Sequence, residues 1–309
     1  MIILRISEND GNQRLDRFLK KYLDKASLSY IYRLIRKDVK INGKRGKNNT
    51  ILLEGDEVKI YVTEDSLKEI HSAKKAVRIK KQFKIVYEDE NILVVNKPFG
   101  LLTHGGGAER KNTLANQVLS YLIAKGDYIP RIEKTFVPAP ANRLDRNTTG
   151  LVIFGKNAVS LKEINRKLRK GENIEKYYIA LVSGELKETL KLEGAITKLE
   201  NANRVEISEE GREAKTLVYP VMSNHDFSLA EIKLLTGRPH QIRAHLAAAG
   251  YPVVGDRKYG NSKINAWALN EFKLKGQFLH AYKLVIDGKI IEGELPQNME
   301  AIKKKIFNI

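Results

Sequence analysis

Hydrophobic residues recur at helical spacing close to the N-terminus. Residues 14–23 (RLDRFLKKYL) place leucines and aromatic residues three or four positions apart, which predicts an amphipathic helix. A second pattern of this kind covers residues 31–37, and Ser29 is its expected N-cap. The dipeptide Asn42-Gly43 follows and is typical of a tight hairpin turn. The first part of the chain is therefore predicted to contain two helices and a hairpin.

A strand-forming pattern and then a basic segment complete this part of the chain. Residues 51–62 predict one or two strands that are interrupted at the turn-forming residues 54–56 (EGD). We therefore expect a small α/β domain over residues 1–64. Residues 65–84 contain seven Lys or Arg and two acidic residues, with scattered apolar positions. This composition predicts a basic linker over residues 65–81, either a solvated hinge or a segment that RNA orders.

From residue 82 onward, short strands dominate the pattern. The runs at 84–87 and 91–96 are separated by three acidic residues, which predicts a hairpin. The run at 150–154 (GLVIF) is short and apolar, as expected of a strand buried on both faces. Further strands are expected at residues 176–182, 217–221, 229–235 and 278–286.

Two helices are predicted among these strands. Leu161, Ile164 and Leu168 lie on one helical face, and that helix is expected to end at Gly171. A second helix is expected to begin with Pro239 as its first residue and to end before Gly250. The strands do not alternate regularly with helices. We therefore predict an α+β domain over residues 82–309, with a mixed, largely antiparallel sheet.

The charge of the chain favours a polyanionic partner. Lys and Arg number 55 against 37 Asp and Glu, giving a formal net charge of +18. Clustered cations gain affinity for nucleic acid by releasing phosphate counterions, although a basic protein without such a partner is the alternative. We expect a nucleic acid as the partner, and no obligate protein partner is evident from the pattern.

Several functional classes are excluded by composition. The chain has no cysteine, so disulfides, thiolate catalysis and cysteine metal sites are excluded. The first residues lack the apolar region of a signal peptide, and no apolar run approaches the roughly 20 residues needed to span a bilayer. A cytoplasmic location without membrane association is therefore expected.

The histidines and glycines do not form a recognisable metal or nucleotide motif. His240 and His245 are five residues apart, so they do not share a helix face well enough to bind one metal. We expect each of them to be structural or to face RNA. Residues 104–107 (HGGG) lack the spacing of the nucleotide-binding loops and are expected to form a loop, which RNA could adjoin. The sequence thus predicts a site without metal or cofactor.

A carboxylate is the best candidate for chemistry. Asp145 stands between two arginines and just ahead of the buried strand at 150–154, where a rigid element can hold a loop residue still. The same tetrapeptide, RLDR, also occurs at residues 14–17, at the start of the first predicted helix. The two copies have the same letters and different surroundings, so they provide an internal control.

Several segments resemble the motifs of the RluA-type pseudouridine synthases. They occur in the order of that family across about residues 82–290, and they are residues 96–106 (NKPFGLLTHGG), 143–150 (RLDRNTTG), 176–184 (KYYIALVSG), 236–246 (TGRPHQIRAHL) and 255–260 (GDRKYG). The resemblance implies the pseudouridine synthase fold and the isomerisation of uridine to pseudouridine in RNA. It also implies that no metal or cofactor takes part.

The resemblance assigns roles to individual residues. Asp145 is expected to be the nucleophile, attacking the sugar at C1′ or the base at C6, or stabilising a glycal-type intermediate. Burial alone favours a neutral acid, so an ion pair with a cation is required, and Arg243 is the candidate. Tyr178 is expected to stack on the base and to help remove the C5 proton. Ile242 is expected to be an apolar wall, and Arg143 to fill the vacated stack or bind a phosphate.

Other motif residues are expected to contact the RNA, and one position departs from the family. Lys97 and His104, both within the first motif, are expected to bind substrate RNA. Asn142 stands where the family usually has His, so a mechanism in which that position carries a proton is not expected here.

The N-terminal domain resembles the S-four-type RNA-binding module. The match includes residues 14–19, 35–44 and 54–56. Arg33, Arg36 and Lys37 share one helix face there and are expected to bind RNA, although a charged face is often only solvated. This combination resembles the branch that acts on large-subunit ribosomal RNA. Transfer RNA is the alternative substrate, and a non-catalytic RNA-binding ribosome-assembly factor or a glycosidase that releases uracil is the alternative function.

Overall fold

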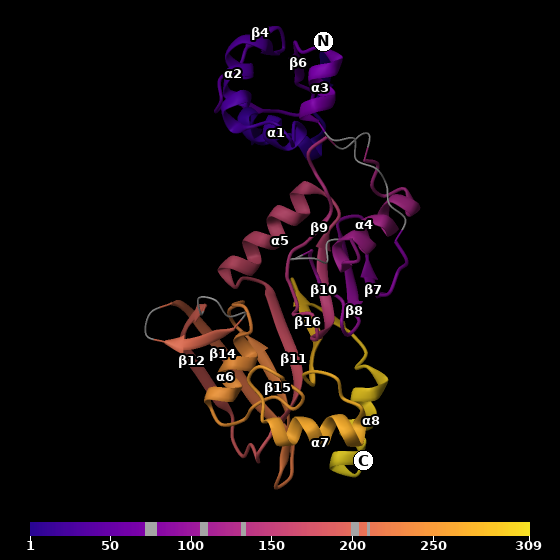
Figure 1. Cartoon of the computed structure of the whole chain (residues 1–309), viewed down its shortest axis with the longest axis vertical. Coiled ribbons are helices and arrows are strands. Elements are labelled where there is room, and N and C mark those ends of the chain that lie inside the picture. Colours follow the sequence, from indigo (N-terminus) through magenta and orange to yellow (C-terminus); the bar gives the residue numbers. More distant parts are fainter. Residues whose placement is uncertain (72–78, 106–110, 131–133, 199–203, 209–210) are drawn as a thin grey trace.

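The computed structural model describes residues 1–71, 79–105, 111–130, 134–198, 204–208 and 211–309. The N-terminal unit lies at one end of the long axis of the molecule (Figure 1). Its sheet has the order β1-β6-β3-β4, and all of its pairs are antiparallel. The elements of this unit are β1 (Ile2–Arg5), η1 (Glu8–Asp10), β2 (Gln13–Arg14), α1 (Leu15–Tyr22), α2 (Leu28–Asp38), β3 (Val39–Ile41), β4 (Lys44–Arg45), β5 (Ile51–Leu52), β6 (Glu57–Ile60) and α3 (Glu64–Ile70).

The two helices and the hairpin predicted near the N-terminus are present, but the second helix begins earlier than expected. Its N-cap is Ser27 and not Ser29, because the Ser27 side chain accepts a hydrogen bond from the backbone N–H of Tyr30. Ser29 lies within the first turn of α2, and its hydroxyl contacts that of Ser27 at 3.0 Å. From the sequence, Ser27 and Ser29 are equally suitable caps, and the hydrogen bond from Tyr30 identifies Ser27 as the one that is used.

Ordered structure continues past residue 64, where a linker was expected. Residues 64–70 form α3, which Thr63 caps by accepting a hydrogen bond from the backbone N–H of Ser66. Leu67 and Ile70 of this helix pack against the core of the N-terminal unit. The expectation of a linker from residue 65 is therefore wrong for these residues. Residues 72–78 of the expected linker lie outside the described part of the chain.

The rest of the described chain is organised around one large sheet with the order β13-β12-β14-β15-β11-β16-β10-β8-β7. β17 pairs with β16 and β9 with β10. The pair β10–β16 is parallel and the other pairs are antiparallel, so the predicted mixed, largely antiparallel sheet is confirmed. The strands are β7 (Lys84–Glu88), β8 (Ile92–Lys97), β9 (Ala139–Pro140), β10 (Thr149–Gly155), β11 (Ile174–Ser183), β12 (Leu190–Lys198), β13 (Val205–Ser208), β14 (Arg212–Ser223), β15 (Phe227–Leu234), β16 (Leu279–Ile286) and β17 (Lys289–Glu292).

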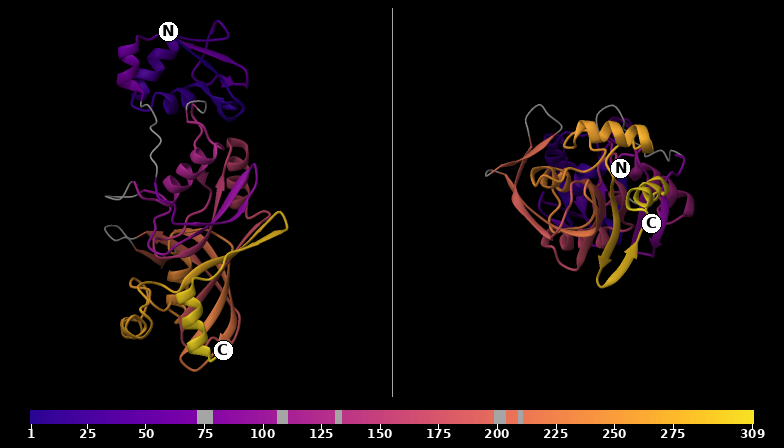
Figure 2. Two further views of the ribbon diagram at one scale, coloured as in Figure 1. Left: turned by 90° about the vertical axis from the view of Figure 1, so that its right-hand side faces the viewer. Right: turned by 90° about the horizontal axis from the view of Figure 1, so that it is seen from below.

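Helices cover both faces of this sheet, and Figure 2 shows it from two further directions. α6 packs against β12, β13 and β14, whereas α7 and α8 lie towards the end that holds the C-terminus (Figure 1). None of the helices that the structure describes is long and apolar enough to cross a membrane. The helices of this part are α4 (Leu114–Lys125), α5 (Ala158–Lys170), α6 (Gln241–Ala248), α7 (Ser262–Phe272) and α8 (Gln297–Phe307).

Strand β10 is the rigid element behind the candidate carboxylate. All seven of its residues are buried, which confirms the prediction from its apolar run. Val152 and Phe154 join the core on one side of the sheet, while Leu151 and Ile153 join the core on the other. Gly150 has φ +116°, and a Cβ there would lie 2.2 Å from the carbonyl oxygen of Ala281. Only glycine permits this close approach to β16.

A buried carboxylate joins the two parts of the molecule. Asp10 is fully buried and accepts hydrogen bonds from the backbone N–H of Thr135 at 2.8 Å and from the Thr135 hydroxyl at 2.7 Å. Gln13 donates to the same hydroxyl at 3.0 Å, and Asn9 accepts from the backbone N–H of Ala158 at the start of α5. These contacts place the N-terminal unit in a defined position against the part of the molecule that contains the large sheet.

We expect Asp10→Ala to loosen this junction without unfolding either part. The backbone N–H and the hydroxyl of Thr135 lose their charged acceptor, and hydrogen bonds to charged groups each contribute about 1.5–3 kcal/mol. Small-angle X-ray scattering should show a broader distance distribution for the variant at unchanged helix content. Identical scattering curves for wild type and variant would contradict this role of Asp10.

Candidate active site

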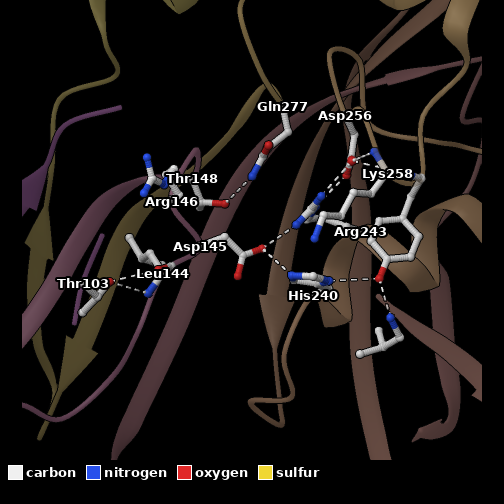
Figure 3. Close-up of polar contacts among 12 residues, drawn as sticks. Thr103, Leu144, Asp145, Arg146, Thr148, His240, Arg243, Asp256, Lys258 and Gln277 are labelled. Carbon is white, nitrogen blue, oxygen red and sulfur yellow. Dashed lines mark hydrogen bonds and ion pairs between the residues drawn. The ribbon is translucent and has the colours of Figure 1, made fainter. Parts of the chain in front are cut away.

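The loop that carries Asp145 is fixed on both sides by hydrogen bonds. It lies between β9 and β10, and its place just ahead of the buried strand β10 was expected from the sequence. The hydroxyl of Thr103 donates to the carbonyl oxygen of Leu144 at 2.9 Å, and Gln277 donates to the hydroxyl of Thr148 at 3.1 Å (Figure 3). The backbone N–H of Thr148 closes a turn on the carbonyl oxygen of Asp145. The carboxylate is therefore held on a rigid support with 29% of its side chain exposed.

Lys97 supports the same loop, and its expected contact with RNA is wrong. The side chain is completely buried, and its ammonium group donates to three backbone carbonyl oxygens, those of Pro98, Leu101 and Arg146. Burial lowers the pKa of Lys97 to about 7, while the charge of Asp145 opposes the shift. An ammonium group enclosed by carbonyl oxygens cannot reach a phosphate. The sequence did not reveal this, because burial of a single lysine has no local pattern.

Asp145 forms an ion pair with Arg243 of α6, 98 residues away. The guanidinium Nη1 lies 2.7 Å from Oδ2 of Asp145, and the remaining nitrogens Nε and Nη2 bind both oxygens of Asp256 at 2.6 and 2.8 Å. Asp256 also accepts from the backbone N–H groups of Lys258 and Tyr259. One arginine thus bridges two carboxylates, of which Asp256 is fully buried (Figure 3).

Burial and charge act in opposite directions on this bridge. Burial disfavours the charged form of Arg243, but the hydrogen bonds to Asp256 and the charges of both carboxylates outweigh it and hold the pKa of Arg243 above its ordinary value. Burial likewise acts to raise the pKa of Asp256, and its bonds to Arg243 overcome this and leave that pKa lowered. Arg243 is therefore a permanent cation beside Asp145.

The first residues of α6 orient the side chain of Arg243. The position at which this helix begins differs from the prediction. The helix begins at Gln241, and its N-cap is His240 with a left-handed φ of 54°. Pro239 was expected as the first helical residue, but it precedes the N-cap, because the chain turns at His240 before entering the helix. Gln241 is buried and donates to the carbonyl oxygen of Lys215 and the hydroxyl of Thr216, which attaches this turn to β14. Gly250, with φ +87°, ends the helix as predicted.

Tyr178 lies on the wall of the same pocket. Its strand β11 shifts register against β16 between Tyr177 and Tyr178, and such a bulge redirects a side chain. The ring of Tyr178 is 5% exposed, and the expected apolar wall, Ile242, is exposed to the same extent. Burial, and to a lesser degree the charge of Asp145, raises the pKa of the Tyr178 phenol. The hydroxyl is therefore protonated at neutral pH.

The pocket around Asp145 has a volume of about 400 Å³ and a cationic lining. Asp145 is the single acid among the described residues that line it. The basic residues of the lining are Arg143, Arg169, Lys176, Arg238 and Arg243. Burial lowers the pKa of Lys176, which stands two residues before Tyr178 on β11, to about 8. Such a pocket is large enough for a nucleoside and favours a phosphate at its entrance.

The other predicted RNA contacts lie at exposed positions. Arg143 is exposed at the rim of the pocket. Burial of His104 lowers its pKa, and the positive charge of Arg143 lowers it further. Arg33, Arg36 and Lys37 are all exposed on α2, as their spacing predicted, and far along the chain from the pocket.

Asn142 has a structural role at the position where the family usually has His. Its side-chain oxygen accepts from the backbone N–H of Ile153 at 2.8 Å, and its amide group donates to the carbonyl oxygen of Leu151 at 3.4 Å. Asn142 therefore attaches the loop of Asp145 to β10 through neutral hydrogen bonds.

Three residues of the site have roles that the sequence did not predict, although His240 was expected to be structural or to face RNA. Asp256 orients Arg243, His240 has Nε2 3.9 Å from Oδ2 of Asp145, and Lys176 adds charge to the pocket wall. All three lie inside the motif segments, and this location in the sequence was the one signal that could have pointed to them. Their partners come from distant parts of the chain, so no local pattern could assign them roles.

Comparisons with known proteins identify the family. A family model described as RNA pseudouridylate synthase matches residues 91–248. The ribosomal large subunit pseudouridine synthase C of Escherichia coli (strain K12) is 32% identical over 318 residues, which cover 98% of this chain and 94% of that protein. An uncharacterized RNA pseudouridine synthase of Mycoplasma capricolum is 35% identical over 264 residues, covering 84% of this chain and 85% of the relative.

A solved structure agrees on the fold. The structure described as human RNA pseudouridylate synthase domain containing 1 has a TM-score of 0.54 and 24% identity, covering 70% of this chain and 84% of that chain. The pseudouridine synthase fold expected from the resemblance is thereby confirmed. Since the family model spans half of the chain and relatives above 30% identity span most of it, the chain belongs to the RNA pseudouridylate synthase family.

Proposed function

We propose that this chain converts specific uridines of large-subunit ribosomal RNA to pseudouridine, with Asp145 as the nucleophile. The ion pair of Asp145 with Arg243, inside a cationic pocket that Tyr178 lines, is the observation that carries the proposal. Relatives that cover nearly the whole of this chain are named for the large ribosomal subunit, which supports the choice of RNA. The cationic lining suits a target nucleotide that is flanked by phosphates.

Within the described part of the chain, one oxygen of the Asp145 carboxylate is bound and the other is available. Arg243 binds Oδ2, so Oδ1 is the oxygen that attacks. Attack at C1′ of the ribose forms an ester while the bond from C1′ to N1 of uracil breaks. The base then turns, C5 bonds to C1′ as the ester breaks, and the C5 proton moves to a base while N1 gains a proton. Attack at C6 is the alternative, and it leaves the same two proton transfers.

Tyr178 stacks on the base during this exchange. Its phenol is protonated in the free protein because burial and the negative charge of Asp145 both raise its pKa. When Asp145 is esterified, its negative charge is lost and no longer raises the pKa of Tyr178. A role of Tyr178 in removing the C5 proton therefore belongs to the step after attack. The ring itself supplies stacking, which contributes about 1–3 kcal/mol per base.

Arg143 fills the space that the flipped uridine vacates, or binds the adjacent phosphate. We expect Arg143→Ala to reduce modification of a structured RNA more than that of a loosely paired fragment with the same target. The loosely paired uridine leaves its stack at a lower cost, since flipping from a structured helix requires a few kcal/mol. Single-turnover rates on the two substrates measure the difference. Equal losses on both would exclude a flipping role for Arg143.

The N-terminal unit binds RNA through the exposed face of α2. Replacing Arg33, Arg36 and Lys37 by alanine should weaken RNA binding and reduce the slope of log affinity against log salt by about 2 to 3. The rate of the bound complex should not change, because these residues lie on a different unit from Asp145. An unchanged salt slope would show that this face is solvated and does not bind RNA.

Mapping of pseudouridine tests the whole proposal. Fragments of large-subunit ribosomal RNA are incubated with the wild type or with Asp145→Asn, derivatised with a carbodiimide and read by reverse transcription. New stops at defined uridines with the wild type alone would support both the reaction and the nucleophile. Stops on transfer RNA only would reassign the substrate, release of free uracil would indicate a glycosidase, and binding without stops on either RNA would favour a ribosome-assembly factor.

A further inference from the structure

We propose that His240 and Tyr259 form a positioning relay for Asp145, in which a neutral His240 directs its Nε2 proton towards the carboxylate and Tyr259 fixes that tautomer. The catalytic part of this inference rests on the proposed role of Asp145, whereas the tautomer of His240 does not depend on it.

The ring of His240 is held between the two side chains. Its Nε2 lies 3.9 Å from Oδ2 of Asp145, and its Nδ1 lies 3.0 Å from the hydroxyl oxygen of Tyr259 (Figure 3). The two rings meet edge to face, with centroids 5.7 Å apart and planes at 75°. The backbone of His240 is left-handed, which is strained for a residue with a side chain and is frequent at functional sites.

The hydrogen bonds of Tyr259 assign the proton on the histidine. The backbone N–H of Val205 donates to the Tyr259 hydroxyl at 2.7 Å, so this oxygen acts as an acceptor there. The hydroxyl proton then points to Nδ1 of His240, which is the remaining hydrogen-bond partner of this group in the described part of the chain. Nδ1 is therefore an acceptor without a proton, and the ring proton is on Nε2, directed at Asp145.

Burial, more than the surrounding charges, favours the neutral form of the His240 ring. Burial lowers the pKa of His240, and the positive charges of Arg243 and Lys258 act in the same direction, against the opposing effect of Asp145 and Asp256. A neutral donor orients a carboxylate without adding a second full positive charge, which would reduce its reactivity as a nucleophile. Arg243 already supplies the one cation that the ion pair needs.

Both donors face the same oxygen of the carboxylate. Arg243 lies 2.7 Å and His240 3.9 Å from Oδ2, so Oδ1 is left for the reaction. The 3.9 Å separation of His240 from Asp145 is too long for a hydrogen bond in the free protein, and we expect it to shorten when substrate binds, as catalytic contacts often do. The relay thus defines which oxygen of Asp145 attacks and restricts rotation of the carboxyl group.

The tautomer can be tested on the free wild-type protein by ¹⁵N NMR of the histidine rings. We expect an unprotonated Nδ1 and a protonated Nε2 for His240, and in Tyr259→Phe a shift towards a mixture of both tautomers. The resonances of His245, on the same helix with Nδ1 on Thr216, serve as the matched control and should not move. A proton on Nδ1 in the wild type, or an imidazolium at neutral pH, would overturn the inference.

Kinetics test the link to catalysis separately. His240→Ala and Tyr259→Phe should each lower kcat, by up to about a hundredfold, with KM nearly unchanged, because orientation and not RNA binding is lost. The double variant should lose no more than His240→Ala alone, and His240→Gln, which retains a donor, should recover part of kcat. Additive losses of kcat in the double variant, or an increase in KM without a change in kcat, would contradict the relay. If the wild type forms no pseudouridine, the proposed function fails while the NMR result still stands.

Discussion

Asp145→Asn is expected to abolish turnover while the protein still folds and binds RNA. The amide has the size of the carboxylate but lacks the charge that pairs with Arg243 and the electron pair that attacks. Loss of a nucleophile of this kind lowers kcat by about a thousandfold or more. Single-turnover assays give the rate and filter binding gives the affinity. A variant that retains a tenth of the activity would exclude Asp145 as the nucleophile.

The second copy of the tetrapeptide provides the matched control, Asp16→Asn. Asp16 is more deeply buried than Asp145, at 6% exposure, and it accepts hydrogen bonds from Arg14 at 2.6 Å and from the backbone N–H of Arg17 at the start of its own helix. The rate of the chemical step should be unchanged, since this carboxylate belongs to the N-terminal unit. An inactive Asp16→Asn variant would show that the assignment of catalysis to the unit that contains Asp145 is wrong.

The two copies of RLDR also show what a sequence can and cannot predict. At residues 14–17, the partner of Asp16 is Arg14, two positions away, and a local pattern is sufficient. At residues 143–146, the partner of Asp145 is Arg243, 98 positions away, although arginines flank the aspartate directly. Only the resemblance to a family, and not the letters themselves, identified Arg243.

Elements with a strong hydrophobic pattern were predicted well, because burial determines both the pattern and the structure. The seven buried residues of β10 and the helix that ends at Gly171 are examples. Choices between near-equal alternatives were not predictable: Ser27 and Ser29 are both good caps, and the turn at His240 displaces Pro239 from the helix. In each case, a contact made by the folded chain decides.

Lys97 illustrates a further limit. A lysine in a family motif is readily interpreted as an RNA contact, yet three carbonyl oxygens enclose its ammonium group. The loop carbonyls that bind it come from residues 98, 101 and 146, and their convergence is a property of the tertiary fold. The sequence predicted which segments form the site, and the folded chain determines which of their side chains face the substrate.

Asp256→Ala is expected to have the largest effect on stability. Asp256 is fully buried and accepts four hydrogen bonds, two from Arg243 and one each from the backbone N–H groups of Lys258 and Tyr259. Removing one partner of a buried pair leaves the other charge uncompensated, which lowers the free energy of unfolding by about 3–5 kcal/mol. Urea denaturation measures the loss. The kcat should also fall by about a hundredfold, because Arg243 is no longer aimed at Asp145.

The double variant Arg243→Met with Asp256→Leu separates these two effects. Replacing a buried ion pair with apolar residues of similar volume often restores stability, so the double variant should unfold at a higher urea concentration than Asp256→Ala. It should remain inactive, because Asp145 then has no cation beside it. A stable and active double variant would show that the ion pair of Asp145 is unnecessary for the reaction. A stable and inactive one would show that this bridge exists for catalysis and not for folding.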